Sequence, residues 1–181
     1  TGCPLNYLPR TDYIQIRDTD QLGNTINVSA FSNVQLTSSA TGVTANTILV
    51  TSGSESSNVK NTLYINYTSV SPNGSISTFQ SGELITADNA TKTANVITSA
   101  ASIGQGTLVR FGEGVIFAKD NFIKVPEQTI VVGEYSSNVS YRVGFTVNES
   151  IITSAEDTSL LDPAQGAFNY TAPGANRLKL T

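Results

Sequence analysis

The side chains that most often do chemistry are scarce in this 181-residue chain. It contains no histidine and a single cysteine, Cys3. The common catalytic triads and zinc sites need histidine or several thiolates and are therefore excluded. A lone cysteine also excludes an intrachain disulfide. We expect Cys3 to be either a small buried hydrophobe or part of a disordered end.

Carboxylates are the remaining candidates for acid–base chemistry. Asp18 and Asp20 alternate onto one face of an extended segment, and Glu156 and Asp157 are adjacent. Glycosidases need two carboxylates on opposite sides of a sugar, usually from different elements, and neither pair has that spacing. We interpret the first pair as a solvated turn. The second pair is interpreted as capping a short helical turn that begins at Thr153, where the residue types match a capping box with Glu156.

A calcium loop is the remaining metal hypothesis. Residues 18–24 alternate Asp and Asn with a glycine, as calcium loops do. No acidic residue closes the segment at the twelfth position, where such loops place their last ligand. The sequence therefore predicts a non-enzymatic protein with no cofactor and no metal.

Composition and charge restrict the partners. Only 13% of the residues are charged, the formal net charge is −4, and the ten lysines and arginines are scattered along the chain. Binding phosphates needs several basic groups on one face, so we expect no nucleic-acid partner. No apolar run reaches the roughly 18 residues of a membrane span, so no membrane insertion is expected. We also expect no signal peptide, and both ends look cut from a longer chain.

Alternating apolar and polar residues predict an all-β fold. We expect antiparallel sandwich-like or barrel-like modules with hairpins and at most one or two short helical turns. The clearest local feature is a hairpin over Gly114–Val125, with a two-residue turn at Asp120 and Asn121. Other expected strands are 25–29, 47–50, 62–68, 129–132, 141–148 and 177–180.

Three segments are predicted from these patterns. Residues 1–24 contain two prolines and little of the periodicity that is typical of strands or helices. This segment fits either an extended arm that connects one subunit to another or a disordered, truncated end. Residues 25–111 form a β module rich in Ser, Thr and Asn, and residues 112–181 form a second β module, truncated at its C-terminus. Within the first module, Gly104–Gly106 is either a hairpin loop or a hinge, and we favour the loop.

The seven tyrosines offer another functional option, because tyrosine rings can form a sugar-binding face. More often, a tyrosine on a strand packs its ring and leaves its hydroxyl wet. Tyr67 and Tyr141 fall on the apolar faces of their strands and are predicted to be core residues. Tyr64 and Tyr170 are the freer candidates for contact with a partner.

The C-terminal segment, residues 140–181, contains the most specific string of the chain. Ser-Tyr-Arg-Val-Gly stands at 140–144, Leu-Leu-Asp-Pro-Ala-Gln-Gly at 160–166, and Asn-Tyr-Thr-Ala-Pro-Gly-Ala-Asn-Arg-Leu-Lys at 169–179. This order resembles a C-terminal block of tailed-bacteriophage structural proteins, chiefly tail-fibre and baseplate-associated chains of cyanophages. Looser resemblances at 62–67, 79–83 and 125–129 extend the similarity over roughly residues 47–181.

The resemblance implies a structural component of the virion tail, in a fibre or in its attachment to the baseplate. Its partners would be other tail and baseplate proteins and further copies of itself, with a trimer favoured, and it would be assembled in the host cytoplasm. The family carries no established catalytic residues, so none are transferred. The alternative is a carbohydrate-binding or host-adhesion module with a host-surface glycan as its partner, which requires an exposed aromatic platform.

The motif block supplies the candidate interface residues. Gly144 is expected to allow close backbone approach, and Gly166 and Gly174 to supply positive φ angles, the latter in a Pro173–Gly174 type II turn. Arg142 and Arg177 are expected to pair with Asp162 or Glu149. The full set of candidates is Tyr141, Arg142, Gly144, Asp162, Gln165, Gly166, Tyr170, Pro173, Gly174 and Arg177.

Overall fold

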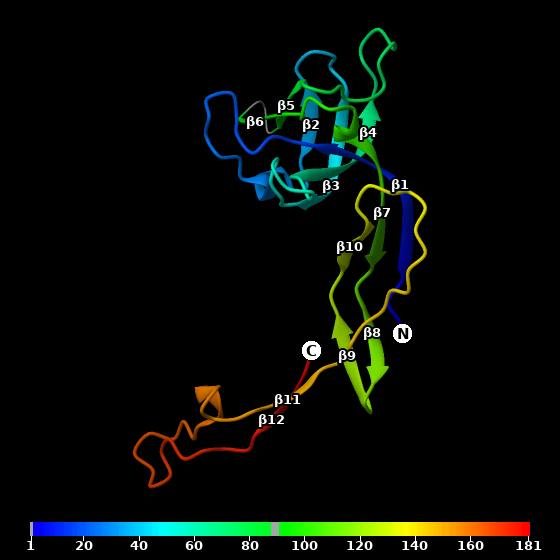
Figure 1. Ribbon diagram of the computed structural model, residues 1–181. Helices are drawn as coiled ribbons and strands as arrows, with labels where there is room; N and C mark the ends of the chain where they lie inside the picture. The colour runs from blue at the N-terminus through cyan, green and yellow to red at the C-terminus, as the bar shows by residue number, and fades with distance from the viewer. Residues whose placement is uncertain (1, 88–90) are drawn as a thin grey trace. The chain divides into compact units, whose positions relative to one another are not determined.

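The computed structural model describes residues 2–87 and 91–181, and its architecture confirms the all-β prediction (Figure 1). Three single 3-10 turns, η1 (Val28–Phe31), η2 (Ala100–Ser102) and η3 (Thr158–Leu160), are its helical parts. The strands are β1 (Leu5–Gln15), β2 (Gln35–Ser38), β3 (Thr44–Thr51), β4 (Thr62–Ser69), β5 (Leu84–Ala87), β6 (Lys92–Asn95), β7 (Ile103–Phe111), β8 (Gly114–Ala118), β9 (Asn121–Val125), β10 (Gln128–Gly133), β11 (Glu149–Ile152) and β12 (Arg177–Leu180). The predicted strands at 47–50, 62–68, 129–132 and 177–180 lie within β3, β4, β10 and β12.

The chain divides into two compact units. The larger, which we call the barrel unit, consists of Pro4–Glu113 and Pro126–Tyr141. The smaller, the ribbon unit, consists of Gly114–Val125 and Arg142–Thr181 with the N-terminal residues up to Cys3. These boundaries differ from the predicted segments 1–24, 25–111 and 112–181.

Strand β1 lies in the segment for which the sequence predicts an arm. It is extended, but it pairs with β4 along one edge and with β7 along the other. The pairing with β7 shifts register between Leu8 and Thr11, where Pro9 and Arg10 form an irregularity and Arg10 takes a φ of 56°. Proline is tolerated inside a sheet at such bulges. Pro9, which made a regular strand look unfavourable from the sequence, therefore lies at a bulge within β1.

Six strands close into a small antiparallel barrel in the order β1-β4-β3-β2-β5-β6. The first and last strands of this order, β1 and β6, are joined by a bridge between Ile16 and Val96, the residues that directly follow them. The Arg17 N–H donates to the Asn95 carbonyl and the Ile97 N–H donates to the Gln15 carbonyl, each at 2.9 Å. Strands β7 and β10 continue the sheet outward from the N-terminal part of β1, as Figure 1 shows.

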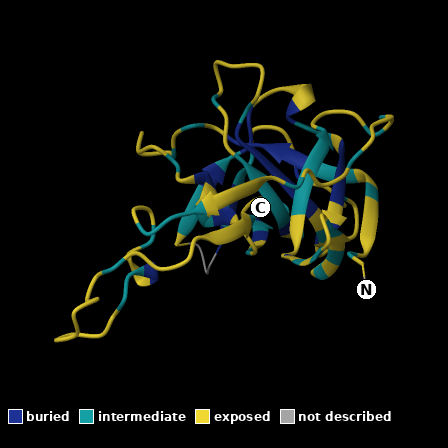
Figure 2. Ribbon diagram, turned by 90° about the horizontal axis from the view of Figure 1, so that it is seen from below, coloured by how far each residue is buried: buried dark blue, intermediate teal, exposed yellow. Residues whose placement is uncertain are grey.

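The barrel interior is the main hydrophobic core. The strands contribute alternate residues, as the period of two requires. Figure 2 shows that the buried stretches of the chain are gathered together, with exposed loops around them. At one place the predicted strand 25–29 is wrong, because Asn27 instead caps η1 by accepting from the Ser29 N–H, and Val28 and Phe31 enter the core. The buried core residues are Ile14, Ile16, Val28, Phe31, Leu36, Val43, Ala45, Leu63, Ile65, Phe79, Ile85, Ala87, Ala94 and Val96.

A second, smaller core lies on the opposite face of β1 and β4. It consists of Tyr13, Tyr64 and Leu108, so the prediction that Tyr64 is free for a partner is wrong. The Tyr64 side chain has 0% exposure, and its hydroxyl donates to the Glu134 carbonyl at 3.1 Å. Burial raises its pKa. Strand periodicity placed Tyr64 on the polar face correctly, but this face is covered by residues that are distant in sequence.

Tyr67 is partly buried against the main core, as predicted. Its hydroxyl accepts from the Phe79 N–H at 3.1 Å, and its ring centroid is 5.4 Å from that of Phe79. Burial raises the pKa of Tyr67 to about 12.

The glycines predicted to form a loop lie instead inside β7. A Cβ atom on Gly104 would stand 2.7 Å from the Tyr13 hydroxyl oxygen. On Gly106 it would stand 2.7 Å from the Glu134 carbonyl oxygen and 2.9 Å from the Tyr64 ring. Glycine inside a strand often marks such a close approach. Both glycines therefore make room for the second core rather than for a turn.

The hairpin β8–β9 in the ribbon unit confirms the sequence prediction, with a turn displaced by one residue. Positive φ occurs at Lys119 (53°) and Asp120 (58°), whereas the sequence predicted Asp120 and Asn121. The turn is thus of the type with two left-handed residues that suits two-residue hairpins. The Asn121 side chain instead donates to the Lys119 carbonyl across the turn.

The predicted strand 141–148 is absent, because within the described part of the chain residues 141–147 have no ladder partner. Asn148, at its end, exchanges two backbone hydrogen bonds with Thr181. Periodicity indicates which residues of an extended segment share a face, but a strand also needs a neighbour. Tyr141, predicted to be a core residue, is 70% exposed. The ribbon unit instead contains the antiparallel pair β11–β12, which supplies the partner of the predicted strand 177–180.

Replacing Gly106 with alanine should lower stability by about 1–3 kcal/mol, because backbone carbonyls crowd the new methyl group and cannot easily yield. The denaturant midpoint of the full chain measures this. Gly144→Ala is the matched control, since no atom lies within 4 Å of a Cβ there, and its midpoint should stay within about 0.5 kcal/mol of the unsubstituted chain. Equal midpoints for both variants would contradict the crowding argument.

Candidate functional site

The central part of the motif block forms a closed loop in the ribbon unit. We call residues 153–176 the motif loop. Its base is a short backbone ladder in which the Asp162 N–H donates to the Ala172 carbonyl and the Thr171 N–H donates to the Asp162 carbonyl, both at 3.0 Å. The Gly174 N–H adds a bond of 2.8 Å to the Leu160 carbonyl. This ladder holds the two sides of the motif loop together.

Two of the three glycine predictions are wrong. Gly166 has a φ of 82°, as expected, but Gly174 is absent from the left-handed region, so Pro173–Gly174 is not a type II turn. A Cβ on Gly174 would lie 2.4 Å from the Leu160 carbonyl oxygen. Close backbone approach, which the sequence predicts for Gly144, is therefore the role of Gly174. Thr171 is left-handed instead, with a φ of 64°.

The motif loop forms an open pocket of about 480 Å³. Its lining brings together three of the candidate residues, Asp162, Gln165 and Tyr170. Thr158 and Ser159 line the same pocket. The other candidates, Tyr141, Arg142, Gly144, Gly166, Pro173, Gly174 and Arg177, are not part of this lining.

The acidic residues at the start of the motif loop act as caps. The Glu156 carboxylate accepts from the Thr153 N–H at 3.0 Å, which is one half of the predicted capping box. In a full capping box the Thr153 hydroxyl would also accept from the Glu156 N–H. Here the Thr153 carbonyl accepts that hydrogen bond instead. Asp157 caps η3 by accepting from the Ser159 N–H at 2.9 Å.

The predicted pairing of Arg142 or Arg177 with Asp162 or Glu149 is wrong. Glu149 lies 3.7 Å from the Lys119 ammonium instead. The Asp162 carboxylate accepts from the Ala164 N–H at 2.9 Å. Hydrogen bonds from Ser159 lower the pKa of Asp157, and the charge of Arg177 lowers it further. Arg177 therefore influences a carboxylate for which the sequence predicts only a capping role.

Asp18 and Asp20 organise loops rather than a common site. The Asp18 carboxylate accepts from the Ser54 hydroxyl at 3.0 Å and the Asn61 amide at 2.9 Å, which ties down a distant loop. Asp20 accepts from the backbone N–H groups of Leu22 and Asn24, each at 2.8 Å. In residues 2–87 and 91–181, no three Asp, Glu or Cys side chains gather into a group that could hold a metal ion.

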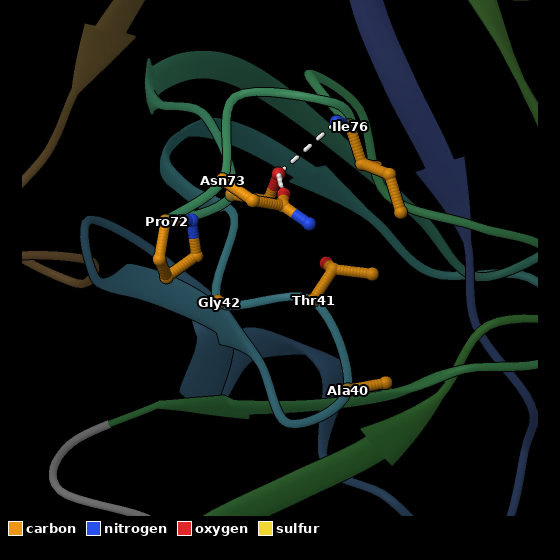
Figure 3. Close-up of a pocket in the computed structure, with 7 residues that line it drawn as sticks. Ala40, Thr41, Gly42, Pro72, Asn73 and Ile76 are labelled. Carbon is orange, nitrogen blue, oxygen red and sulfur yellow. Dashed lines mark hydrogen bonds between the residues drawn. The ribbon is translucent and has the colours of Figure 1, made fainter.

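A second pocket, of about 390 Å³, lies at one end of the barrel (Figure 3). The Ser71 hydroxyl donates to the Asn73 side chain and accepts from the Ile76 N–H. The buried Thr41 hydroxyl has no hydrogen-bond partner among the described residues. The lining has neither an aromatic ring nor a charged group, and one bridging water would satisfy a single hydroxyl. This pocket therefore offers less for recognition than the motif-loop pocket.

Sequence comparison provides the family of the chain. The chain belongs to the family described as a domain of unknown function, DUF4815, whose model matches residues 85–181, more than half of its length. Neither the curated proteins nor the solved structures contain a match. The matched range begins in β5 and includes the whole motif loop. No helix in residues 2–87 or 91–181 has the length and apolar character needed to cross a membrane.

Replacing Arg177 with glutamine should raise the pKa of Asp157 toward its ordinary value, because a favourable positive charge is removed. A carboxyl whose pKa is lowered in the folded state stabilises that state above its unfolded pKa. This contribution is lost as the pH falls through the folded pKa. As the pH is lowered, Arg177→Gln should therefore lose the stabilising contribution of the Asp157 carboxylate at a higher pH than the unsubstituted chain does.

An NMR titration of the side-chain carboxyl carbons measures this change. Arg142→Gln is the matched control, since it removes an equal charge and should leave the Asp157 titration unchanged. An unshifted Asp157 in Arg177→Gln would show that these two groups do not interact.

Proposed function

We propose that this protein is a non-enzymatic structural component of a bacteriophage tail, located in a fibre or in its attachment to the baseplate. The proposal assigns no reaction to any side chain. It assigns the ribbon unit to assembly, with copies of the chain forming a homo-oligomer, a trimer being favoured. Other tail and baseplate proteins would be the further partners.

The observation that carries the proposal is that both two-stranded ribbons leave apolar cross-strand pairs exposed. Phe117 and Phe122 are directly opposite each other in β8–β9, with ring centroids 5.1 Å apart, and are 63% and 74% exposed. Ile151 and Leu178 are opposite each other in β11–β12 and are 64% and 56% exposed. Apolar side chains grouped in this way favour a contact surface over free exposure to water.

The strand pairing in the ribbon unit supports the same proposal. An isolated two-stranded hairpin is only marginally stable in water, and three or more strands or a packed face are needed for independent stability. Among the described residues, each of the four ribbon strands has one partner strand. A single bridge from Gly2 to Val115 contacts the outer edge of β8, and the other outer edges of the two ribbons are open. Open edges invite pairing with another chain. A closed ring of copies would cover both the edges and the apolar pairs.

The motif string adds the biological setting. The order Ser-Tyr-Arg-Val-Gly, Asp-Pro-Ala-Gln-Gly and Ala-Pro-Gly-Ala-Asn-Arg resembles a block of phage tail proteins. Most of this string lies in the ribbon unit. The resemblance and the exposed apolar pairs therefore point to the same part of the chain.

The double substitution Phe117→Ser with Phe122→Ser should convert an oligomeric full chain into a monomer. Removing both rings takes away the largest exposed apolar pair of the ribbon unit. Sedimentation velocity measures the mass of each form. Leu22→Ser is the matched control, because Leu22 is 87% exposed but lies in the barrel unit, and it should leave the mass unchanged. A monomeric unsubstituted chain would overturn the assembly role.

The tail location has its own test. Antibodies raised against the full chain should label the tail in electron micrographs of purified particles of the phage that encodes it. Particles that lack the chain altogether would overturn the proposed location, whatever its oligomeric state.

A further inference from the structure

We propose that the pocket of the motif loop binds a neutral, hydroxyl-rich saccharide. This inference goes beyond the tail assignment and does not rest on it, because it follows from the contents of one pocket. The volume of about 480 Å³ lies within the range of small-molecule sites, roughly 300–1,000 Å³.

The residues that line the pocket carry groups that match the two sides of a sugar ring. Tyr170 is 46% exposed and lines the pocket, so its ring offers an apolar surface for the C–H face of a pyranose. Asp162 and Gln165 supply a carboxylate and an amide to sugar hydroxyl groups. Leu161 and Pro163 provide further apolar lining. A few polar groups set among apolar surface is the usual composition of a ligand site.

The Asp162 carboxylate has capacity left for a ligand. Its Oδ1 accepts from the Ala164 N–H at 2.9 Å. Its Oδ2 has no hydrogen-bond partner in the described parts of the chain. A carboxylate oxygen accepts strong, charge-assisted hydrogen bonds, and sugar hydroxyls are suitable donors.

Charge decides between classes of saccharide. Asp162 is the sole charged side chain among the residues that line the pocket. Arg177, the cation of this region that lowers the pKa of Asp157, does not line it. An anionic ligand, such as a sialylated or phosphorylated glycan, would place like charges together. The pocket therefore favours a neutral sugar.

The backbone holds these groups in place before any ligand arrives. The ladder at Asp162, Thr171 and Ala172 ties both walls of the pocket together. Thr171 lies directly after Tyr170 and has a φ of 64°, a conformation that β-branched residues rarely adopt. A pocket whose walls are already fixed loses less entropy on binding.

A second copy of the chain is better suited to the apolar pairs of the ribbons than to this polar pocket.

The test uses the full chain on an array of neutral and sialylated oligosaccharides. The neutral oligosaccharide with the strongest signal is then titrated calorimetrically. We expect Tyr170→Ala to abolish measurable binding and Asp162→Asn to weaken it about tenfold. The asparagine retains an oxygen for the Ala164 N–H, so the turn survives while the charge is lost. Tyr170→Phe retains the ring and should bind within about twofold of the unsubstituted chain.

The control variant is Tyr7→Ala, which removes an equally accessible tyrosine, 54% exposed, from the barrel unit. It should bind like the unsubstituted chain. Absence of binding to every neutral oligosaccharide, equal binding to sialylated ones, or equal loss in Tyr7→Ala would each overturn the proposal. Sedimentation velocity on Tyr170→Ala separates the two functions. A changed oligomer mass would show that Tyr170 serves subunit contacts, and it would overturn the saccharide assignment while leaving the tail proposal intact.

Discussion

The fold of the barrel unit depends on one strand, β1, which pairs with β4 along one edge and with β7 along the other. The chain at and just beyond the C-terminal end of β1 closes the barrel, through hydrogen bonds that flank the bridge between Ile16 and Val96. Strand β1 itself pairs with β7 from Leu5 to Ile14. The main core fills the inside of the closed barrel, and the second core covers β1 and β4 from outside. Without β1 the barrel would have two unpaired edges and the second core would lose Tyr13.

The two units meet different physical requirements. The barrel unit satisfies most of its strand edges within itself and buries two cores. The ribbon unit has two-stranded ladders, exposed apolar pairs and a loop that is held by its own backbone. This contrast is why assembly is assigned to the ribbon unit. The motif loop keeps its shape through local hydrogen bonds, so the proposed saccharide pocket does not depend on the proposed subunit contacts.

Local patterns were sufficient for local structure. Alternation predicted the hairpin at Gly114–Val125 and the inward face of Leu63 and Ile65, because both depend on residues close in sequence. The patterns failed where a distant segment decides the outcome. Tyr64 is buried by β7 and β10, and Tyr141 is exposed because its segment has no partner strand. In the same way, the glycines of β7 looked like a loop because the rings they accommodate belong to other strands.

The motif loop was located from sequence, but its geometry was not. The string around Asp162, Gln165 and Tyr170 was singled out, and the structure brings these three residues to one pocket. The type II turn predicted at Gly174 and the carboxylate partners predicted for the arginines are both wrong, because a short motif considered alone does not show contacts across the loop. The bond between Gly174 and Leu160 and the influence of Arg177 on Asp157 cross the loop. Such contacts appear only once the loop has closed.

The double role of β1 has a consequence for biosynthesis. The residues that β1 needs for its partnership with β7 lie about a hundred positions downstream, so on the ribosome the first strand is made long before the strands that complete it. Topologies dominated by such distant pairing form slowly, because a long loop must close before any contact compensates for the lost entropy. Newly made chains would spend that interval with an unsatisfied β1. In that window they would depend on chaperones, or on low local concentration, to avoid premature association.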